Sequence, residues 1–574
     1  MPNYFLIFIT VNSKLHNSNK LTEKQPEIPK LKKSTIIILS ILLLQLACTT
    51  EQKQATTQSN KTLQVILASS PENLDPQSLI FTADWQAAAL VYEGLVQFTE
   101  NDRTLQPLLA ESWQVLDGGK RLVFKLREDV FFHDDPCFPN GKGRKLTPKD
   151  VVYTFEQLAR AKDCSKWYLF AGKIMGIDDF REGTAKKIEG ITILDDHRIQ
   201  FELTRPYVAF LKILATPTAF IIPREAVEYY GENFKEHPVG TGPFRLVRWK
   251  PFEEMVYVRN ENYWRFAQNR QRLPVLDGVK FRLISNYSLG LAEFLKGDNH
   301  FLTITHQDYL RLQADPSFSQ NFQVAGVSQG LTVRFFGFAM DKPTTLAQNT
   351  QLRQALAMSF NRQRIVSEVL HDVYKIAHTL VPPHLLGISK SNLPEFHPFN
   401  PEQGRKIVNQ LNTEVKADSF EFWANIETRG GDSFIKESRE IGVPITFHHV
   451  PAGYYPSIIN ERPDVFRVSY HPSFLDPEEY YVLFYSKSDP SINLCGYKNP
   501  EFDAVLEQTM VEQAPQKRQA LFLQLEAILR KDVPAIYLHH NPDRYFIAPK
   551  NVTGLKLRSG IMDFSEVTLQ TVKY

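Results

Sequence analysis

The heptapeptide Pro238-Val239-Gly240-Thr241-Gly242-Pro243-Phe244 is the most informative stretch of this 574-residue chain. Its two glycines, one residue apart, suggest a loop that cradles a phosphate group. Such a cradle binds through backbone N–H groups, however, and Pro243 has none. We therefore interpret the heptapeptide as a tight turn that joins two structural elements.

Hairpin signals precede this turn in the chain. Apolar and polar residues alternate across residues 113–126 and 191–203, with the turn sequences Asp117-Gly118-Gly119 and Asp195-Asp196 in the middle. Alternation with a period of two around a turn of Gly or Asp is typical of two antiparallel strands. We therefore predict a β-hairpin in each range.

Helical signals are mixed with these strands. Thr147 is suited to cap a helix that begins at Pro148, and an apolar stripe repeats from Lys517 to Arg530. Since a single core stops growing at about 250–300 residues, a chain of this length needs two or three lobes. The expected fold class is α/β (mixed), in several lobes.

The N-terminal segment has the features of an export signal. Three lysines between Lys30 and Lys33 precede about a dozen apolar residues, which is short for a membrane span of about 20 residues. The segment ends in Leu46-Ala47-Cys48, which resembles a bacterial lipobox. Gln45 departs from that pattern, because lipoboxes prefer Leu three places before the Cys.

We therefore predict a signal segment over residues 1–47, lipidation of Cys48, and a polar tether over residues 48–61. This places the protein in the bacterial cell envelope, lipid-anchored, on the periplasmic or outer face of the membrane. Export also permits disulfides, and Cys137 and Cys164 are the candidate pair.

Composition and motifs exclude several classes of protein. The formal net charge of +2 argues against nucleic acid as a partner. The four cysteines include no CxxC pair, so zinc ribbons and redox motifs are absent from the sequence. We find no HExxH, GxSxG, P-loop or dinucleotide motif. We expect no catalytic residue, no metal and no cofactor, and therefore not an enzyme.

The heptapeptide also resembles the signature of the extracellular solute-binding protein family 5, the oligopeptide- and dipeptide-binding group. Other blocks that resemble the family follow one another in its order over roughly residues 62–545. They are Asn73-Leu74-Asp75-Pro76, Tyr92-Glu93-Gly94-Leu95-Val96, Leu146-Thr147-Pro148-Lys149-Asp150-Val151, Asn262-Tyr263-Trp264, Leu352-Arg353-Gln354-Ala355-Leu356 and Tyr497-Lys498-Asn499-Pro500-Glu501-Phe502-Asp503.

The resemblance implies a periplasmic-binding-protein-like fold of two hinged halves plus an extra lobe. In this chain, lobe I would comprise residues 62–100, 225–320 and 541–574. Lobe II, an insert, would be residues 101–224, and lobe III residues 321–540.

The resemblance also implies a function. The protein would be the substrate-binding lipoprotein of an ABC importer, a monomer that captures a peptide or peptide-like solute between its lobes. It would deliver that solute to the ABC permease complex in the membrane. A ligand sensor that feeds a membrane receptor, and an envelope hydrolase on the same fold, are the alternatives.

Ligand-binding residues follow from the same resemblance, because peptides bind these proteins as an added strand. Glu93, Gly94 and Leu95 would form one edge, although Gly94 is equally consistent with a helix cap. The other edge would be Ser469, Tyr470, His471 and Ser473, and Tyr537 would stack on the ligand.

Ser473 is a departure from the family pattern. Peptide binders have an Asp there, which pairs with the peptide's α-ammonium, and Ser supplies no charge. Either another carboxylate such as Glu93 replaces it, or the ligand has no free amine.

Overall fold

The computed structural model describes residues 61–100, 104–162, 164, 166–389, 395–411, 419–425, 430–558 and 560–570. The predicted signal segment, Cys48 and nearly all of the tether lie outside the described residues. The described residues belong to one unit, Lys61–Tyr574. Within them, no helix has the length and apolar character needed to cross a membrane.

A four-stranded sheet in the order β1-β10-β9-β8 includes the strand that follows the heptapeptide. β1 (Thr62–Leu67) pairs in parallel with β10 (Gly278–Leu283). β9 (Glu254–Arg259) is antiparallel to both of its neighbours, β10 and β8 (Phe244–Lys250). Since β8 begins at Phe244, the turn predicted before it is confirmed.

Both predicted hairpins occur in a second four-stranded sheet, in the order β4-β5-β7-β6. β4 (Ala110–Leu116) and β5 (Arg121–Leu126) form the first hairpin, and β6 (Ile191–Ile193) and β7 (Arg198–Glu202) form the second. β5 and β7 join the two hairpins as antiparallel neighbours.

The C-terminal half contains a mixed six-stranded sheet in the order β14-β18-β13-β17-β15-β16. Its strands are β14 (Lys375–Ile376), β18 (Ala535–His540), β13 (Val333–Phe338), β17 (Val465–Tyr470), β15 (Phe420–Ala424) and β16 (Ile445–His449). β13 is antiparallel to β17 and β18, whereas β15 is parallel to β16 and β17.

Smaller sheets connect these parts. One has the order β11-β19-β12 and consists of β11 (Leu302–Ile304), β19 (Arg544–Pro549) and β12 (Phe322–Ser328). The strand pairs are β2 (Val96–Phe98) with β3 (Leu105–Pro107), β20 (Val552–Thr553) with β23 (Thr568–Leu569), and β21 (Lys556–Arg558) with β22 (Ile561–Asp563).

Helices lie between the strands along most of the chain. Those of the first half are α2 (Thr82–Ala88), α3 (Pro148–Arg160), α4 (Ile177–Arg181), α5 (Phe210–Ile213), α6 (Arg224–Tyr230), α7 (Tyr287–Lys296), α8 (His306–Gln313) and α9 (Pro316–Asn321). Those of the second half are α10 (Thr345–Gln348), α11 (Thr350–Ser359), α12 (Arg362–Arg364), α13 (Pro383–Leu386), α14 (Pro401–Gln410), α16 (Gly431–Glu440), α17 (Tyr454–Glu461), α18 (Glu478–Tyr481), α19 (Pro500–Val511) and α20 (Pro515–Asp532).

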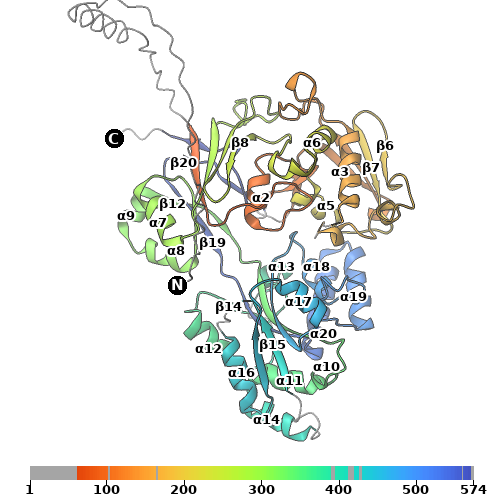
Figure 1. Cartoon of the computed structure of the whole chain (residues 1–574), viewed down its shortest axis with the longest axis vertical. Helices are drawn as coiled ribbons and strands as arrows, with labels where there is room; N and C mark the ends of the chain where they lie inside the picture. Colours follow the sequence, from red (N-terminus) through yellow and green to blue (C-terminus); the bar gives the residue numbers. More distant parts are fainter. Residues whose placement is uncertain are drawn as a thin grey trace, which may run out of the picture. The chain divides into compact units, whose positions relative to one another are not determined.

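The two predicted helices are confirmed as α3 and α20, and the mixed α/β class is confirmed with them. Thr147 caps α3 together with Asp150, whose carboxylate accepts the backbone N–H of Thr147 at 2.8 Å. Figure 1 shows α3, α5 and α6 grouped near β6 and β7, and α11, α14 and α16 grouped near β15. The lobe boundaries stay a prediction.

The heptapeptide turn packs directly on the backbone of residues 90–91. The N–H of Gly242 donates to the Val91 carbonyl at 2.8 Å, and that of Phe244 donates to the Leu90 carbonyl at 3.0 Å. A Cβ atom at Gly242 would lie 2.7 Å from the Leu90 oxygen, and one at Gly240 would overlap the Val91 oxygen. Both positions therefore need glycine for close backbone approach.

The predicted disulfide between Cys137 and Cys164 is not formed in the structure. Cys137 is half-buried beside Asp135, whose carboxylate accepts its backbone N–H at 2.9 Å. Cys164 is buried in the segment after α3. Burial raises the pKa of the Cys137 thiol, which disfavours the thiolate needed for exchange.

Candidate ligand-binding site

Two chambers lie where segments of the first and second halves of the chain meet. The main chamber encloses about 410 Å³, and the side chamber encloses about 90 Å³. Trp85, Ile561 and Met562 line both chambers, so α2 and β22 form a wall that the two chambers share.

The main chamber is built from the ends of strands and helices that are distant in sequence. It is lined by the end of β1, by α2 and α7, by β11, by the β12–β13 and β18–β19 connections, and by the end of β17. Its volume falls within the range of about 300–1,000 Å³ that small-molecule sites occupy.

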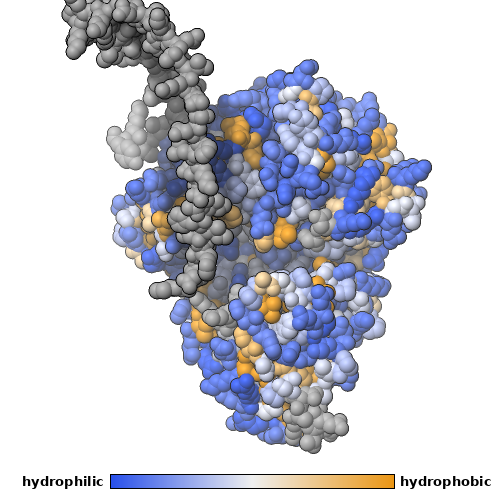
Figure 2. Space-filling model, viewed as in Figure 1, coloured by the Kyte–Doolittle hydropathy of each residue, from blue (hydrophilic) through white to orange (hydrophobic). Residues whose placement is uncertain are grey.

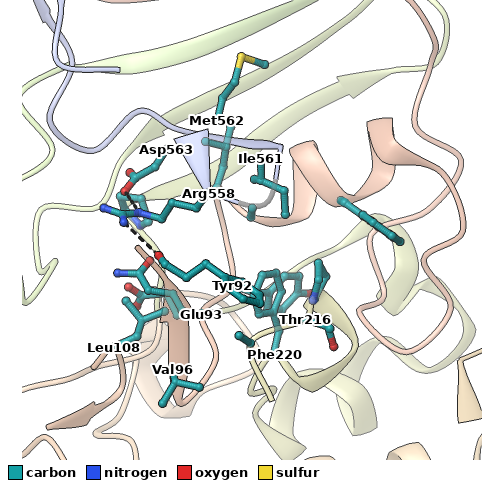
Figure 3. Close-up of a pocket in the computed structure, with 18 of the residues that line it drawn as sticks. Tyr92, Glu93, Val96, Leu108, Thr216, Phe220, Arg558, Ile561, Met562 and Asp563 are labelled. Carbon is teal, nitrogen blue, oxygen red and sulfur yellow. Dashed lines mark hydrogen bonds and ion pairs between the residues drawn. The ribbon is translucent and has the colours of Figure 1, made fainter. Parts of the chain in front are cut away.

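The side chamber lies beside it and is mostly apolar. Figure 3 shows Tyr92, Val96 and Phe220 on one side of this chamber and Ile561 and Met562 on the other. Its charged groups are paired within the protein. Asp563 lies 3.3 Å from Arg558 and 3.8 Å from Arg265, and the combined charge of these two arginines holds the pKa of Asp563 below its ordinary value, although burial raises it.

Glu93, a predicted ligand residue, lines the side chamber, but its carboxylate accepts three hydrogen bonds from the protein. The donors are Tyr263 at 2.9 Å, Thr241 at 2.8 Å and the indole N–H of Trp264 at 3.1 Å. Burial raises the pKa of Glu93, and these three donors oppose that rise. The side chain therefore joins three sequence blocks into one structural unit.

Gly94 and Leu95 line neither chamber. A Cβ atom at Gly94 would lie 3.2 Å from the Leu214 carbonyl oxygen, so its lack of a side chain permits contact with protein backbone. The Gly94 and Leu95 carbonyls accept hydrogen bonds from residues 108–110. The helix-cap interpretation of Gly94 is wrong, because α2 already ends at Ala88.

Ser469 and His471, at the end of β17, line the main chamber. Ser469 is the register partner of Arg334 on β13. On its other side, β17 pairs with β15 only at Val465 and Phe466. Within the described residues, the end of β17 therefore has a ladder partner on one side alone.

Ser473 lines the side chamber, and a carboxylate lies directly behind it. The Ser473 backbone N–H donates to Glu479 Oε1 at 3.0 Å, and the hydroxyls of Tyr470 and Tyr168 donate to the same oxygen at 2.9 and 2.7 Å. Tyr470 thus points to Glu479 and lines neither chamber. Glu479 is buried, and burial raises its pKa.

Tyr537 lies in the core of the six-stranded sheet and also lines neither chamber. Its ring centroid lies 4.6 Å from that of Phe396, and it is 1% exposed. Of the predicted ligand residues, the structure brings Glu93 and Ser473 to the side chamber and Ser469 and His471 to the main chamber.

Sequence reasoning missed Trp85, Arg334 and Arg544, which all line the main chamber. The ring of Trp85 lies close to that of His471, with ring centroids 6.4 Å apart. Each of these residues comes from a different element, and none belongs to a sequence motif that would have marked it as a candidate.

A cluster of buried and partly buried polar groups joins residues 168–212 to residues 473–479. We call Tyr168, Tyr207, Lys212, Asp476, Glu478 and Glu479 the joining cluster. Lys212 Nζ lies 2.8 Å from Asp476 Oδ2, and the Tyr207 hydroxyl donates to Glu478. Burial raises the pKa of Asp476, but the charges of Lys212 and Arg518 outweigh it and hold that pKa below its ordinary value.

Comparison with known proteins agrees with this arrangement. Residues 104–491 match the model of the bacterial extracellular solute-binding proteins, family 5. The chain belongs to this family. The family consists of solute-binding proteins that work with ABC transporters and not of enzymes. The predicted family, and the prediction of a binding protein in place of an enzyme, are therefore confirmed.

Individual relatives differ in what their names say they bind. The chain is 25% identical to the peptide transport periplasmic protein SapA of Salmonella typhimurium, over 79% of this chain and 81% of that protein. It is 26% identical to the probable deoxycholate-binding periplasmic protein YgiS of Escherichia coli, over 83% of this chain and 87% of that protein.

A solved structure has the same fold. The periplasmic binding protein DppA of Helicobacter pylori, in complex with the peptide STSA, superposes with a TM-score of 0.72 at 20% identity. The match covers 90% of this chain and all of that chain. The binding-protein fold predicted from the sequence is therefore confirmed.

Proposed function

We propose that this protein captures a peptide or peptide-like solute in the main chamber and delivers it to the permease of an ABC importer. The observation that carries the proposal is the open side of β17 at Ser469, on the wall of the main chamber. An extended ligand can add to such a backbone edge as a further strand.

The joining cluster supports a binding mode in which the lobes close around the solute. Its hydrogen bonds link residues 168–212 of the proposed lobe II to residues 473–479 of the proposed lobe III. A solute that contacts both sides of the main chamber favours the closed arrangement, because it binds that arrangement better than the open one.

Attachment to the membrane is a separate part of the proposal. A lipid on Cys48 would keep the protein near its permease, and the polar tether would let it move. Replacing Cys48 with Ser should release the protein from the membrane fraction into the soluble envelope fraction. Unchanged retention of Cys48→Ser in membranes contradicts the anchor and leaves solute binding untouched.

The binding proposal is tested by identifying what co-purifies with the native protein. Denaturation followed by mass spectrometry should release intact peptides or peptide-like molecules. Ala68 is exposed on the wall of the main chamber, so Ala68→Trp should fill the chamber and abolish this material. The same change at Ala314, exposed at the end of α8, is the matched control and should retain the material.

Two results contradict the proposal. Material that is equally abundant in the Ala68→Trp preparation does not bind in the main chamber. Material that contains no peptide or peptide-like molecule places the ligand in another chemical class.

A further inference from the structure

The lining of the main chamber contains arginines and lacks carboxylates. Arg334 and Arg544 line it together with His471, and neither Asp nor Glu occurs among its described lining residues. The side chamber differs, because Glu93 and Asp563 balance its two arginines. The surplus of positive charge is therefore a property of the main chamber.

Arg334 is held in place without a negative partner. Its Nη1 donates to the side-chain oxygen of Asn541 at 3.0 Å, and its guanidinium lies 5.6 Å from the centroid of the Tyr374 ring. Its Nε is buried and has no hydrogen-bond partner. A neutral amide and an aromatic ring thus orient the guanidinium while its charge stays unneutralised.

Nearby acidic groups do not compensate for this charge. Asp543 precedes Arg544 in the chain, but its carboxylate accepts the backbone N–H of Gly330 at 3.1 Å and lies 3.7 Å from Lys375 Nζ. Among the residues that the structure describes, no carboxylate forms an ion pair with Arg334 or Arg544.

The pKa values of neighbouring groups indicate the same surplus. Burial, together with the charges of Arg544 and Lys166, lowers the pKa of His471 to about 4. Burial also lowers the pKa of Arg467, and Arg334 adds to that shift. Each of these groups loses protons more readily than usual in this surrounding.

We propose that the main chamber selects solutes that carry a carboxylate, which Arg334 and Arg544 bind. The inference rests on the proposed function and adds a substrate class to it. Arg334 is partly buried and Arg544 is exposed. The fork of N–H groups on each guanidinium matches the two oxygens of a carboxylate. The described lining of the main chamber has no Asp or Glu that could pair with a free ammonium, so the carboxylate is the group that the site recognises.

The test compares tri-alanine with its C-terminal amide and its N-acetyl form. Protein stripped of ligand by unfolding and refolding is titrated with each form by calorimetry. The amide should bind at least about tenfold more weakly than the acid, because it has one neutral acceptor oxygen where the carboxylate has two that share a negative charge. The N-acetyl form should bind within about threefold of the acid, well below the cost of a lost charged bond.

Arg334→Gln and Arg544→Gln should weaken binding of the acid and remove the difference between acid and amide. Arg311→Gln, at an exposed position on α8, is the matched control and should leave both affinities unchanged. Unaltered melting temperatures identify variants that fold. Equal affinity for acid and amide, or a difference that survives in both arginine variants, overturns the inference while peptide binding stands.

A second measurement separates this inference from the proposed function. If no form of tri-alanine binds, the material released from native protein is converted to methyl esters and weighed again. Material that gains ester groups and is lost from the Arg334→Gln preparation supports the carboxylate site, even where the solute is not a peptide. Material with no group to esterify overturns it.

Discussion

At the scale of single residues, Glu93 explains why three separated sequence blocks occur together in this chain. Its carboxylate receives Tyr263 and Trp264 from one block and Thr241 from another, and it stands in a third. A buried carboxylate needs such donors, because an unpaired one costs several kcal/mol. The Glu93 carboxylate therefore contributes to folding by holding these three blocks together.

Replacing Glu93 with Gln should therefore lower the free energy of unfolding by about 1–3 kcal/mol. The amide has one acceptor oxygen for the donors that now share two, and Trp264 can only donate. Urea unfolding followed by far-ultraviolet circular dichroism measures the change. Glu261→Gln is the control at an exposed site, with a side chain that is 73% exposed, and should unfold like the parent chain. Equal midpoints for both variants would show that the three donors do not depend on the charge.

Single residues also mark where sequence reasoning ends. The departure at Ser473 is visible in the sequence, but Glu479 behind it is not, because six residues and a turn separate them. Arg334 is the second residue of β13, which is otherwise apolar or glycine, and its missing partner becomes apparent only when the residues around it in space are known.

At the scale of elements, local sequence signals predicted hairpins and helices correctly, but no sequence signal indicated the pairing of strands that are distant in the chain. The hairpins β4–β5 and β6–β7 and the helices α3 and α20 have turn residues, caps or apolar stripes within a few positions of one another. The six-stranded sheet brings β13 beside β17 and β18, which are distant in sequence. No local pattern specifies that pairing, so the walls of the main chamber could not be assembled from sequence.

The turn before β8 gives a prediction about how this element is attached. A Cβ atom at Gly242 would lie 2.7 Å from the Leu90 oxygen, and its nearest neighbours are all backbone atoms, which leaves little room to relax. Gly242→Ala should lower the free energy of unfolding by about 1–3 kcal/mol, the usual cost of overpacking. Thermal unfolding measures the loss.

Gly290, in the interior of α7, is the matched control for that exchange. Its nearest neighbours would be 3.5 Å or more from an added Cβ atom. Gly290→Ala should be neutral or slightly stabilising, since Ala favours helix by about 1 kcal/mol over Gly. A Gly242→Ala variant as stable as Gly290→Ala would mean that the turn can move away from residues 90–91.

At the scale of the whole molecule, the joining cluster links parts of the chain that carry different sheets. Lys212 extends from α5 to Asp476, which Arg518 also binds through two hydrogen bonds of 2.7 and 2.8 Å. Asp476 therefore keeps a bidentate partner when Lys212 is removed. Figure 2 shows a face of the molecule that is mainly hydrophilic with small hydrophobic patches. Polar contacts such as those of the joining cluster suit segments that separate and meet again.

Replacing Lys212 with Met should weaken closure while leaving each lobe folded. The Lys212 side chain is 28% exposed, so solvent screens the ion pair in part, and we expect the dissociation constant for tri-alanine to rise by about threefold to tenfold. Small-angle scattering should show a smaller decrease in the radius of gyration on adding tri-alanine. Lys120→Met is the control, because Lys120 pairs with Glu202 at 3.6 Å inside a single sheet region. If Lys212→Met binds tri-alanine and contracts as fully as the Lys120→Met protein, the joining cluster follows closure and does not stabilise it.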